Sequence, residues 1–553
     1  MRIALLTEGN LSVAQRTGGG WCGRLAGALA EHEFQLYLLG SGGGADFAGA
    51  PPRGLLAVHE LPIWGRRPAG RRPAAHRRRA YSTAYEDLVR SLVHPAERAR
   101  FAPALHRLAE LAREDGALPA FLGSGQAHRT LERVWRAPGA ETAAGQPLVR
   151  DVLVAGDLLE QLLRPLSAPW YGTGPNGLGS ADLCHVAGGG PAVLPALIAK
   201  HLHGVPFVLT EHGLHLREQY RGYRTAPYRW PVRALLLAFF RQLTAETYRQ
   251  AAVLTPGSGY DRRWQERCGA DPERVRVVHE STPEAGREPA GAEPERPTLV
   301  WAGALEPGRD PELMLHAFAR VRAELPAARL RMYGEEAAPG YLAHCRAIAR
   351  RLGIGAAVDF AGRPPATADA WAAGSALVFT ALSQRSPRLL ADAMLSGRAV
   401  IATEVGIVPE VLGPAGLVVP PRSPRALADA CLALLTDEER RARLGLAGRL
   451  RAQERFALEP EAAAFREIYL ELVSRWPAFP AAAERMRPFA RPAEYWVAGA
   501  PVPAPQTRRE TPAAPEGGPS GARDGAAPDG PAPDGPAPDA GRAEPGALAE
   551  ASR

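Results

Sequence analysis

Lysine is almost absent from this sequence, since Lys200 is the only lysine among the 66 basic residues of the 553-residue chain. Exchange of lysine for arginine throughout a chain is typical of a GC-rich genome, and scattered arginines of this kind are weak evidence for nucleic-acid binding. The sequence also lacks a stripe of interleaved aromatic and basic residues, which a nucleic-acid reader would show. Although the net charge is +7, the sequence therefore predicts no nucleic-acid partner.

Cysteine is scarce as well, and its pattern excludes several kinds of site. The cysteines lie far apart, without a CxxC pair or a zinc-ligand spacing: Cys22, Cys184, Cys268, Cys345 and Cys431. Isolated thiols fit a reducing cytoplasm. No apolar run reaches the length of about 18 residues that spans a bilayer. The first residues, MRIALLTEG, contain no cleavage site and predict a first strand rather than a signal peptide, so we expect a cytoplasmic protein.

A chain of 553 residues exceeds what one hydrophobic core usually organises, which predicts two large domains. The first opens on a strand at 2–7, a glycine cluster at 18–20 and then a helix. Strand, glycine loop and helix form the opening of a nucleotide-binding α/β unit. Helical patterns at about 81–113 and 150–164 predict a helical insertion within the less regular stretch of about 45–175.

The second half is a clear alternation of strands and helices after a linker rich in proline, glutamate and glycine at 283–297. Strands are predicted at 298–303, 328–333, 357–361, 376–380, 399–403 and 416–420. Helices are predicted between them at about 311–324, 341–352, 366–373, 388–396 and 425–436. Such alternation predicts a parallel sheet with helices on both faces.

These patterns define the predicted domains. Residues 1–285 form an N-terminal Rossmann-like domain that carries the helical insertion, and residues 296–455 form a second Rossmann-like domain. Residues 456–475 form a C-terminal amphipathic helix, with apolar side chains at helical spacing. Residues 500–553 are rich in proline, alanine, glycine and aspartate. They have too little apolar surface to offset the entropy of ordering, which predicts a disordered tail.

Two segments leave alternatives open. The arginines of 66–79 form a solvated loop or contact an anionic surface or an acceptor, and the loop is favoured. The predicted helix at 229–250 contains the apolar run LLLAFF. Its apolar face packs beneath a domain or touches a membrane surface, and packing is favoured.

Local motifs narrow the class of nucleotide-binding protein. The strings are MRIALLTEG with a glycine-rich turn before Trp21-Cys22, EHEF (31–34), DLCH (182–185), HGVPFVLTEHGLHLRE (203–218), TPGSGYDRRW (255–264), WAGALEPGRD (301–310) and ATEVGIVPEVLGPAGLVVPPRSPRALA (402–428). They resemble the PelF-type glycosyltransferases, a branch of the family-4-like retaining GT-B enzymes, over about residues 1–475.

The resemblance implies an α/β fold of GT-B architecture, in which two Rossmann-like domains place their parallel sheets across a cleft. It also implies transfer of a sugar, with retention, from a nucleoside-diphosphate sugar, UDP-linked in this family, to a glycan or polysaccharide acceptor. The acceptor belongs to the N-terminal domain and the donor to the C-terminal one. The expectation includes no metal and no redox cofactor.

A donor site without a metal depends on cationic side chains and helix N-terminal amides to stabilise the diphosphate. The family places glycine and arginine after the first strand of the C-terminal domain, and a lysine five residues later. This sequence has Gly303, Ala304 and Arg309 at those positions. Arg309 can still pair with a diphosphate in altered geometry, whereas Ala304 removes one charge-assisted contact.

The second donor motif of the family is a pair of glutamates eight positions apart, and this sequence has Gln384 and Asp392 there. The resemblance assigns the donor sugar to Gln384 and the nucleotide ribose to Asp392. Arg385 is either a replacement cation or, as favoured, solvent-facing. The implied donor-binding set is completed by Ser386, Leu389 and Glu410.

The linker end of the cleft carries one further departure, because Glu280-Ser281 replaces the family's asparagine and glycine. In the N-terminal domain, His185 and His212 each follow a predicted strand, at the edge where cleft residues lie in such sheets. A satisfied core histidine is the alternative for each. The glycines Gly18, Gly19 and Gly20 present backbone amides to the transferred group or form only a tight turn.

Two functions remain open at this stage. The first is a working retaining glycosyltransferase with His185, His212, Arg309 and Gln384 as its catalytic residues. The second is a catalytically inactive pseudo-glycosyltransferase that acts as a binding or partner subunit. The expected partners are a nucleotide-sugar donor, a glycan acceptor and, through peripheral contact at the inner face of the membrane, a membrane-bound export complex.

Overall fold

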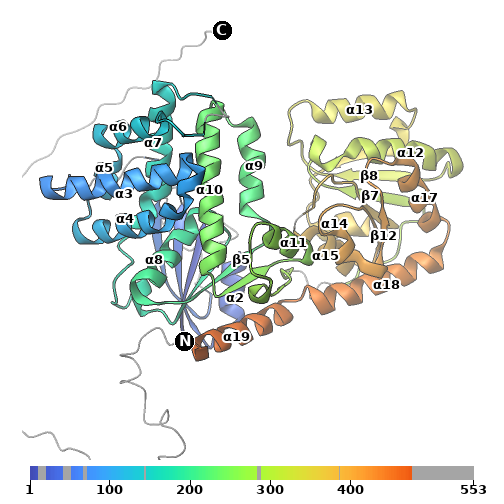
Figure 1. Ribbon diagram of the computed structural model, residues 1–553. Coiled ribbons are helices and arrows are strands. Elements are labelled where there is room, and N and C mark those ends of the chain that lie inside the picture. Colours follow the sequence, from blue (N-terminus) through green and yellow to red (C-terminus); the bar gives the residue numbers. More distant parts are fainter. Residues whose placement is uncertain are drawn as a thin grey trace, which may run out of the picture. The chain divides into compact units, whose positions relative to one another are not determined.

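The computed structural model describes residues 1–9, 20–40, 52–65, 71–141, 145–282, 288–384 and 386–475. The predicted tail at 500–553, the predicted linker core at 283–287 and Arg385 lie outside these residues. Two parallel sheets organise the described part, one in each half of the chain (Figure 1). The α/β fold class predicted from the sequence is confirmed by these two sheets.

The first sheet has six parallel strands in the order β3-β2-β1-β4-β5-β6. The strands are β1 (Arg2–Glu8), β2 (Glu33–Gly40), β3 (Leu55–Pro62), β4 (Leu183–Ala187), β5 (Phe207–Glu211) and β6 (Val253–Pro256). The chain changes direction across the sheet between β1 and β4. In a doubly wound sheet, the crevice at the carboxyl ends of such a pair is the usual ligand site.

The second sheet repeats this order, running β12-β11-β10-β7-β8-β9. The strands are β7 (Thr298–Ala302), β8 (Arg329–Tyr333), β9 (Val358–Gly362), β10 (Ala376–Phe379), β11 (Ala399–Thr403) and β12 (Leu417–Val419). All six predicted strands of this half form within one or two residues of the expected positions. Buried parallel strands are near-continuous apolar runs, which makes them conspicuous in a sequence.

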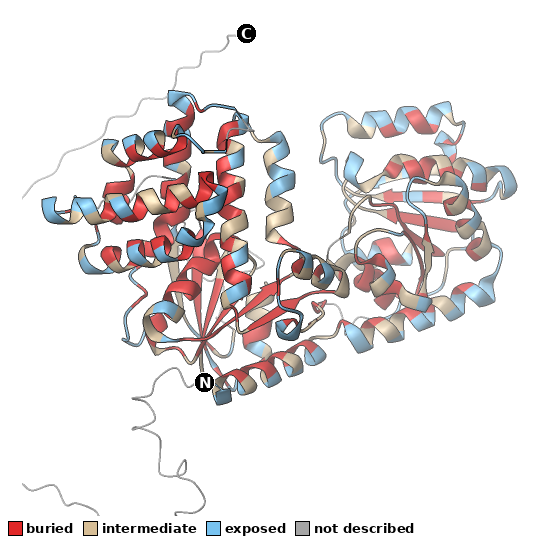
Figure 2. Ribbon diagram, viewed as in Figure 1, coloured by how far each residue is buried: buried red, intermediate tan, exposed pale blue. Residues whose placement is uncertain are grey.

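Helices cover both sheets. Those of the first half are α2 (Trp21–Ala28), α3 (Ala75–Val93), α4 (Phe101–Asp115), α5 (Leu118–Leu122), α6 (Gly125–Trp135), α7 (Val149–Leu163), α8 (Val193–His203), α9 (His215–Thr225), α10 (Trp230–Gln250) and α11 (Gly259–Arg267). Those of the second half are α12 (Pro311–Glu324), α13 (Tyr341–Arg351), α14 (Thr367–Ala372), α15 (Arg388–Leu395), α16 (Val408–Leu412), α17 (Pro424–Leu435), α18 (Glu438–Arg455) and α19 (Leu458–Arg475). Figure 2 shows the strands buried and the outer helix faces exposed.

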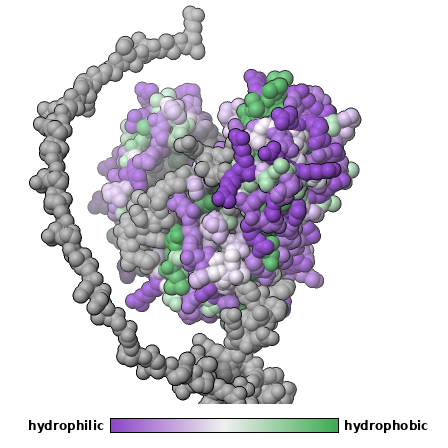
Figure 3. All heavy atoms as spheres, turned by 90° about the vertical axis from the view of Figure 1, so that its left-hand side faces the viewer, coloured by the Kyte–Doolittle hydropathy of each residue, from purple (hydrophilic) through white to green (hydrophobic). Residues whose placement is uncertain are grey.

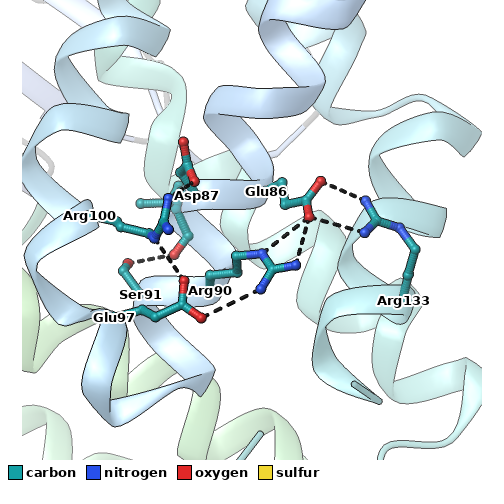
Figure 4. Close-up of polar contacts among 8 residues, drawn as sticks. Glu86, Asp87, Arg90, Ser91, Glu97, Arg100 and Arg133 are labelled. Atoms are coloured by element: carbon teal, nitrogen blue, oxygen red, sulfur yellow. Dashed lines mark hydrogen bonds and ion pairs between the residues drawn. The ribbon is translucent and has the colours of Figure 1, made fainter. Parts of the chain in front are cut away.

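The helical insertion begins later than the irregular stretch suggested, because Leu55–Pro62 forms β3 at the edge of the first sheet. Helices α3 to α7 then form a layer over the first half. An ion-pair network crosses this layer (Figure 4): Glu86 accepts from Arg90 and Arg133, and Arg90 also contacts Glu97. The two arginines lower the pKa of Glu86 to about 2. The network ties α3 to α6.

Helix α10 carries the LLLAFF run, and its apolar side chains Leu235, Leu236, Phe239 and Phe240 are buried in the core of the first half. This favours the packing alternative for that face. Among the described residues, every helix is too short or too polar to cross a bilayer.

Helix α19, predicted as an amphipathic C-terminal helix, returns to the first sheet. Its Phe465 and Tyr469 belong to one buried cluster with Ile3 and Leu5 of β1. The indole of Trp21, at the start of α2, donates a 2.7 Å hydrogen bond to Glu461. The last described helix thus completes the core under the first strands, far from its place in the sequence.

Candidate functional site

A pocket of about 600 Å³ opens at the carboxyl ends of β1, β4 and β5, the switch point of the first sheet. Its lining combines glycines, an indole, two imidazoles and two carboxyl groups. These residues are Glu8, Gly9, Gly20, Trp21, Gly188, Gly189, His212, His215 and Glu218. A concave, partly apolar space with a few convergent polar groups is the usual form of a small-molecule site.

Glu8 ends strand β1 and enters this pocket. Burial raises the pKa of its carboxyl to about 7, since a charged carboxylate loses its hydration there. Burial likewise lowers the pKa of His215 to about 4, so its imidazole is neutral. A side chain at Gly190, whose φ is +80°, would lie 2.5 Å from Nε2 of His215 and 3.0 Å from Oε2 of Glu8. Glycine is therefore required where these two groups converge.

His212 follows β5 and lines the pocket. Its predicted catalytic role stays a prediction. Its ring meets the edge of Trp21 at a centroid distance of 5.2 Å. Nδ1 lies 3.9 Å from Oε1 of Glu280. Nε2 is buried and has no hydrogen-bond partner among the described residues. A buried polar atom without a partner is costly, so Nε2 is a natural hydrogen-bonding group for a ligand.

His185 was predicted to follow a strand, but it lies in the middle of β4 (Leu183–Ala187). The side chain is fully buried in β4. Nδ1 contacts the hydroxyl of Tyr469 at 2.5 Å, and Nε2 contacts Oγ1 of Thr210 at 2.6 Å. Burial lowers its pKa to about 3. Both nitrogens contact other side chains, and the residue anchors α19 to the sheet. The catalytic role of His185 stays a prediction.

Glu211 supports the pocket from beneath. Its buried carboxylate accepts from the Tyr248 hydroxyl at 2.7 Å and from Nε2 of Gln265 at 2.8 Å. It also accepts from the backbone amide of His215 at 3.3 Å. Burial raises the pKa of Glu211, and these hydrogen bonds oppose that rise. The acid therefore fixes the turn that presents His212 and the start of α9.

In the second half, the structure brings three predicted donor-site residues together. Nη1 of Arg309 donates a 3.0 Å hydrogen bond to Oε1 of Gln384, and Nε2 of Gln384 donates to the carbonyl of Ser386 at 2.8 Å. Gly303 follows β7, and a side chain there would lie 3.6 Å from Cγ of Arg309. These residues lie at the carboxyl ends of β7 and β10, the switch point of the second sheet.

Glu280, noted in the sequence as a departure, joins this cluster. Its buried carboxylate accepts from Oγ of Ser386 at 3.0 Å and lies 2.7 Å from Nε of Arg388. Arg388, the first residue of α15, was not predicted as a site residue from the sequence. The available signal was the acid Glu280 directly after the string Val277-Val278-His279, because an acid that becomes buried needs a partner.

Three other predicted donor-binding residues are buried, half-buried or already hydrogen-bonded within the protein: Asp392, Leu389 and Glu410. Asp392 is buried on α15 and accepts from Nε1 of Trp371 at 2.9 Å, while Leu389 packs against the same core. The carboxylate of Glu410 accepts from the amides of Gly259 and Tyr260, at 2.8 and 3.2 Å, and so caps α11. Their donor-binding roles stay predictions.

The predicted glycine cluster is described only at its last member. Gly20 precedes α2 and lines the pocket. Gly18 and Gly19 lie outside the described residues.

Two family models match the chain, one in each half. Residues 1–273 match a family model described as a domain of unknown function, DUF3492. Residues 296–437 match the family model Glycosyl transferases group 1. Over these residues the second half of the chain is similar to the glycosyltransferases of group 1. Arg309, Gln384 and Ser386 all lie within this match.

Among curated proteins, the D-inositol 3-phosphate glycosyltransferase of Streptomyces bingchenggensis is 33% identical over 225 residues, which are 37% of this chain and 49% of the relative. The chain thus spans about half the length of the curated relative that it matches.

Solved structures identify the fold. A glycosyltransferase from Rickettsia africae has a TM-score of 0.51 at 12% identity, and the match covers 85% of this chain and 98% of that one. HepE of Anabaena, in complex with UDP and glucose, has a TM-score of 0.47 at 13% identity, over 84% of this chain and 98% of its own. The likeness to the Rickettsia africae structure, together with the two sheets, confirms the predicted GT-B fold.

Proposed function

We propose that this protein transfers a sugar, with retention, from a UDP-linked donor to a glycan or polysaccharide acceptor. The observation that carries the proposal is the cluster of Arg309, Gln384 and Ser386 at the switch point of the second sheet. The sequence strings that resemble the PelF type supply the finer class. We also propose the cytoplasm as its location, since it would use an intracellular donor there.

Arg309 is the proposed ligand of the diphosphate. Its guanidinium donates to the neutral amide of Gln384, and its Nε lies 3.9 Å from Oε1 of Glu306. The amide is a weaker partner than an anion, because hydrogen bonds between ions are the stronger ones. Donor binding would exchange that amide for phosphate oxygens. Gln384 is then released to hydrogen-bond a sugar hydroxyl. The chain itself needs no metal for these contacts.

The pocket of the first half is the proposed acceptor site. Glu8 with its raised pKa, His212 with its unpartnered Nε2 and the indole of Trp21 offer hydrogen bonds and an apolar face. Sugars present the same combination of hydroxyls and C–H faces. The volume of about 600 Å³ lies within the range of about 300–1,000 Å³ that small-molecule pockets occupy.

Calorimetry with UDP, UDP-sugars and GDP-sugars tests the proposal, together with a donor-hydrolysis assay on the same preparation. We expect binding to UDP-linked donors and slow hydrolysis. A folded protein that binds none of these donors would contradict the enzyme hypothesis.

A second candidate function, an inactive partner subunit, is favoured by a different observation. Alanine stands at 304, Gln384 has no charge, and Asp392 already accepts from Trp371. In that case the same calorimetry shows no binding of any of these donors, although the protein is folded. Donor binding with turnover would exclude this candidate.

A further inference from the structure

The outer end of the helical insertion presents an unusual surface, which we call the insertion tip. It consists of residues 145–154, at the start of α7, and residues 224–233, at the end of α9 and the start of α10. An ion pair between Arg229 and Asp151 joins the two segments. Arg136, just after α6, donates to the carbonyl of Pro147 at 3.2 Å. Figure 1 shows α9 and α10 joined at this upper end.

Apolar side chains gather on the tip. Of the eleven large hydrophobic side chains that are exposed among the described residues, five lie here: Leu148, Val149, Leu153, Val154 and Trp230. Trp230 and Val149 are each 61% exposed. Val149 and Leu153 are one helical turn apart and share a face. Figure 3 shows a hydrophobic group at the top of the molecule, bordered by hydrophilic residues. Single exposed apolar residues are ordinary, but a contiguous group marks an interaction surface.

The tip also carries four arginines: Arg150, Arg224, Arg229 and Arg233. The guanidinium of Arg233 lies over the Trp230 ring at 5.1 Å and donates to the carbonyls of Arg224 and Ala226. Asp151 is the only acid within the tip and is paired with Arg229. Just outside the tip lie Glu132, which is paired with Arg136, and the exposed acids Glu141 and Asp157. The tip therefore has a clear excess of positive charge.

We infer that the insertion tip docks on the surface of an anionic lipid bilayer. Tryptophan is enriched at the membrane–water interface, and a few aliphatic side chains beside it can enter the boundary between headgroups and acyl chains. Guanidinium groups pair with lipid phosphates, and an anionic leaflet attracts each cation near it. The arginine excess favours this occupant over an uncharged protein surface.

The docking is weak and reversible, because the apolar group is small. It requires neither donor nor acceptor, so its failure and the failure of the proposed glycosyltransferase activity are separate results. The tip lies at the end of α10 that is remote from β6. None of its residues lines the pocket of the first sheet.

Co-sedimentation of the full chain with vesicles tests the inference. One set of vesicles contains phosphatidylcholine alone, and the other contains phosphatidylcholine mixed with phosphatidylglycerol. We expect sedimentation with the mixed vesicles, little with phosphatidylcholine alone, and a steep loss at high salt because screening shortens the reach of the charges. Equal binding to both lipids, or to neither, would overturn the inference.

Two variants examine the two kinds of contact. Val149→Asp with Leu153→Asp removes the aliphatic anchors, and we expect at least tenfold weaker binding to the mixed vesicles. Arg150→Glu with Arg224→Glu reverses two charges, and each loss of a surface cation lowers binding about fivefold.

The matched control is Leu446→Asp with Leu450→Asp on α18, because these leucines are also one turn apart and 59% and 58% exposed. We expect wild-type vesicle binding from this control. Thermal unfolding by circular dichroism verifies that each variant is folded. An equal loss of binding in the control pair and the tip pair would refute the tip as the docking site.

Discussion

Nη1 of Arg309 donates a 3.0 Å hydrogen bond to Oε1 of Gln384, although 75 positions separate the two residues in the sequence. The family pattern assigns a cation and an acid to these positions, and here the acid has become an amide. The contact therefore leaves the guanidinium charge uncompensated by this partner. An anion that reaches the switch point of the second sheet meets a cation that is already held in place.

Arg309→Ala is expected to weaken UDP binding about 10- to 100-fold, the range for loss of hydrogen bonds to a charged group. Arg309→Lys keeps the charge and restores the residue type that the resemblance assigns to this position. We expect it to bind UDP within a few fold of wild type. Calorimetry measures both. Unchanged UDP affinity in Arg309→Ala would remove the diphosphate role from this residue.

Glu8 makes stability depend on pH in a defined window. Its pKa rises from 4.5 to about 7 in the folded state, so the folded protein binds the proton more tightly than the unfolded chain does. The free energy of unfolding therefore falls as the pH rises between those values. Glu8→Gln lacks this contribution. Urea denaturation at several pH values should show a shallower slope for the variant, and identical slopes would contradict the raised pKa.

Gly190→Ala places a methyl group against His215 and Glu8 at a left-handed backbone position. Gly204→Ala is the matched control, since its φ is +71° and a side chain there meets open space. The control should cost about 1 kcal/mol of unfolding free energy from backbone strain alone. Gly190→Ala should cost a further 1–3 kcal/mol or so from overpacking. Equal losses in urea denaturation would show that Glu8 and His215 do not converge at this glycine.

Tyr469→Phe leaves Nδ1 of His185 buried without its partner. The expected loss of unfolding free energy is about 1–3 kcal/mol, the cost of an unsatisfied buried group. UDP binding should remain at the wild-type level, because the contact lies in the core of the first half. Tyr220→Phe, at an exposed tyrosine on α9, should change stability by less than about 0.5 kcal/mol. A strong loss of UDP affinity in Tyr469→Phe would instead connect His185 to the donor site.

Much of the fold follows from the sequence, because buried parallel strands and the helices between them have distinct periods. The run Ala399–Thr403 is wholly buried and was predicted as a strand from its apolar residues alone. Leu55–Pro62 was missed, since it lies at the sheet edge, half-exposed, with His59 and Glu60 among its residues. Edge strands share the mixed composition of loops, so only strand pairing identifies them.

The candidate site, like the fold, was predicted only in part from the sequence. The sequence by itself predicted the strands of the second half and supplied the residue types of the donor motif, because these are local patterns. Only the tertiary structure separated His185 from His212, which were both predicted to follow strands. Tyr469, 284 positions away, occupies a nitrogen of His185, while Nε2 of His212 has no such partner among the described residues. Local sequence places a residue near a strand, but contacts with residues distant in the sequence decide whether its polar atoms are free to bind a ligand.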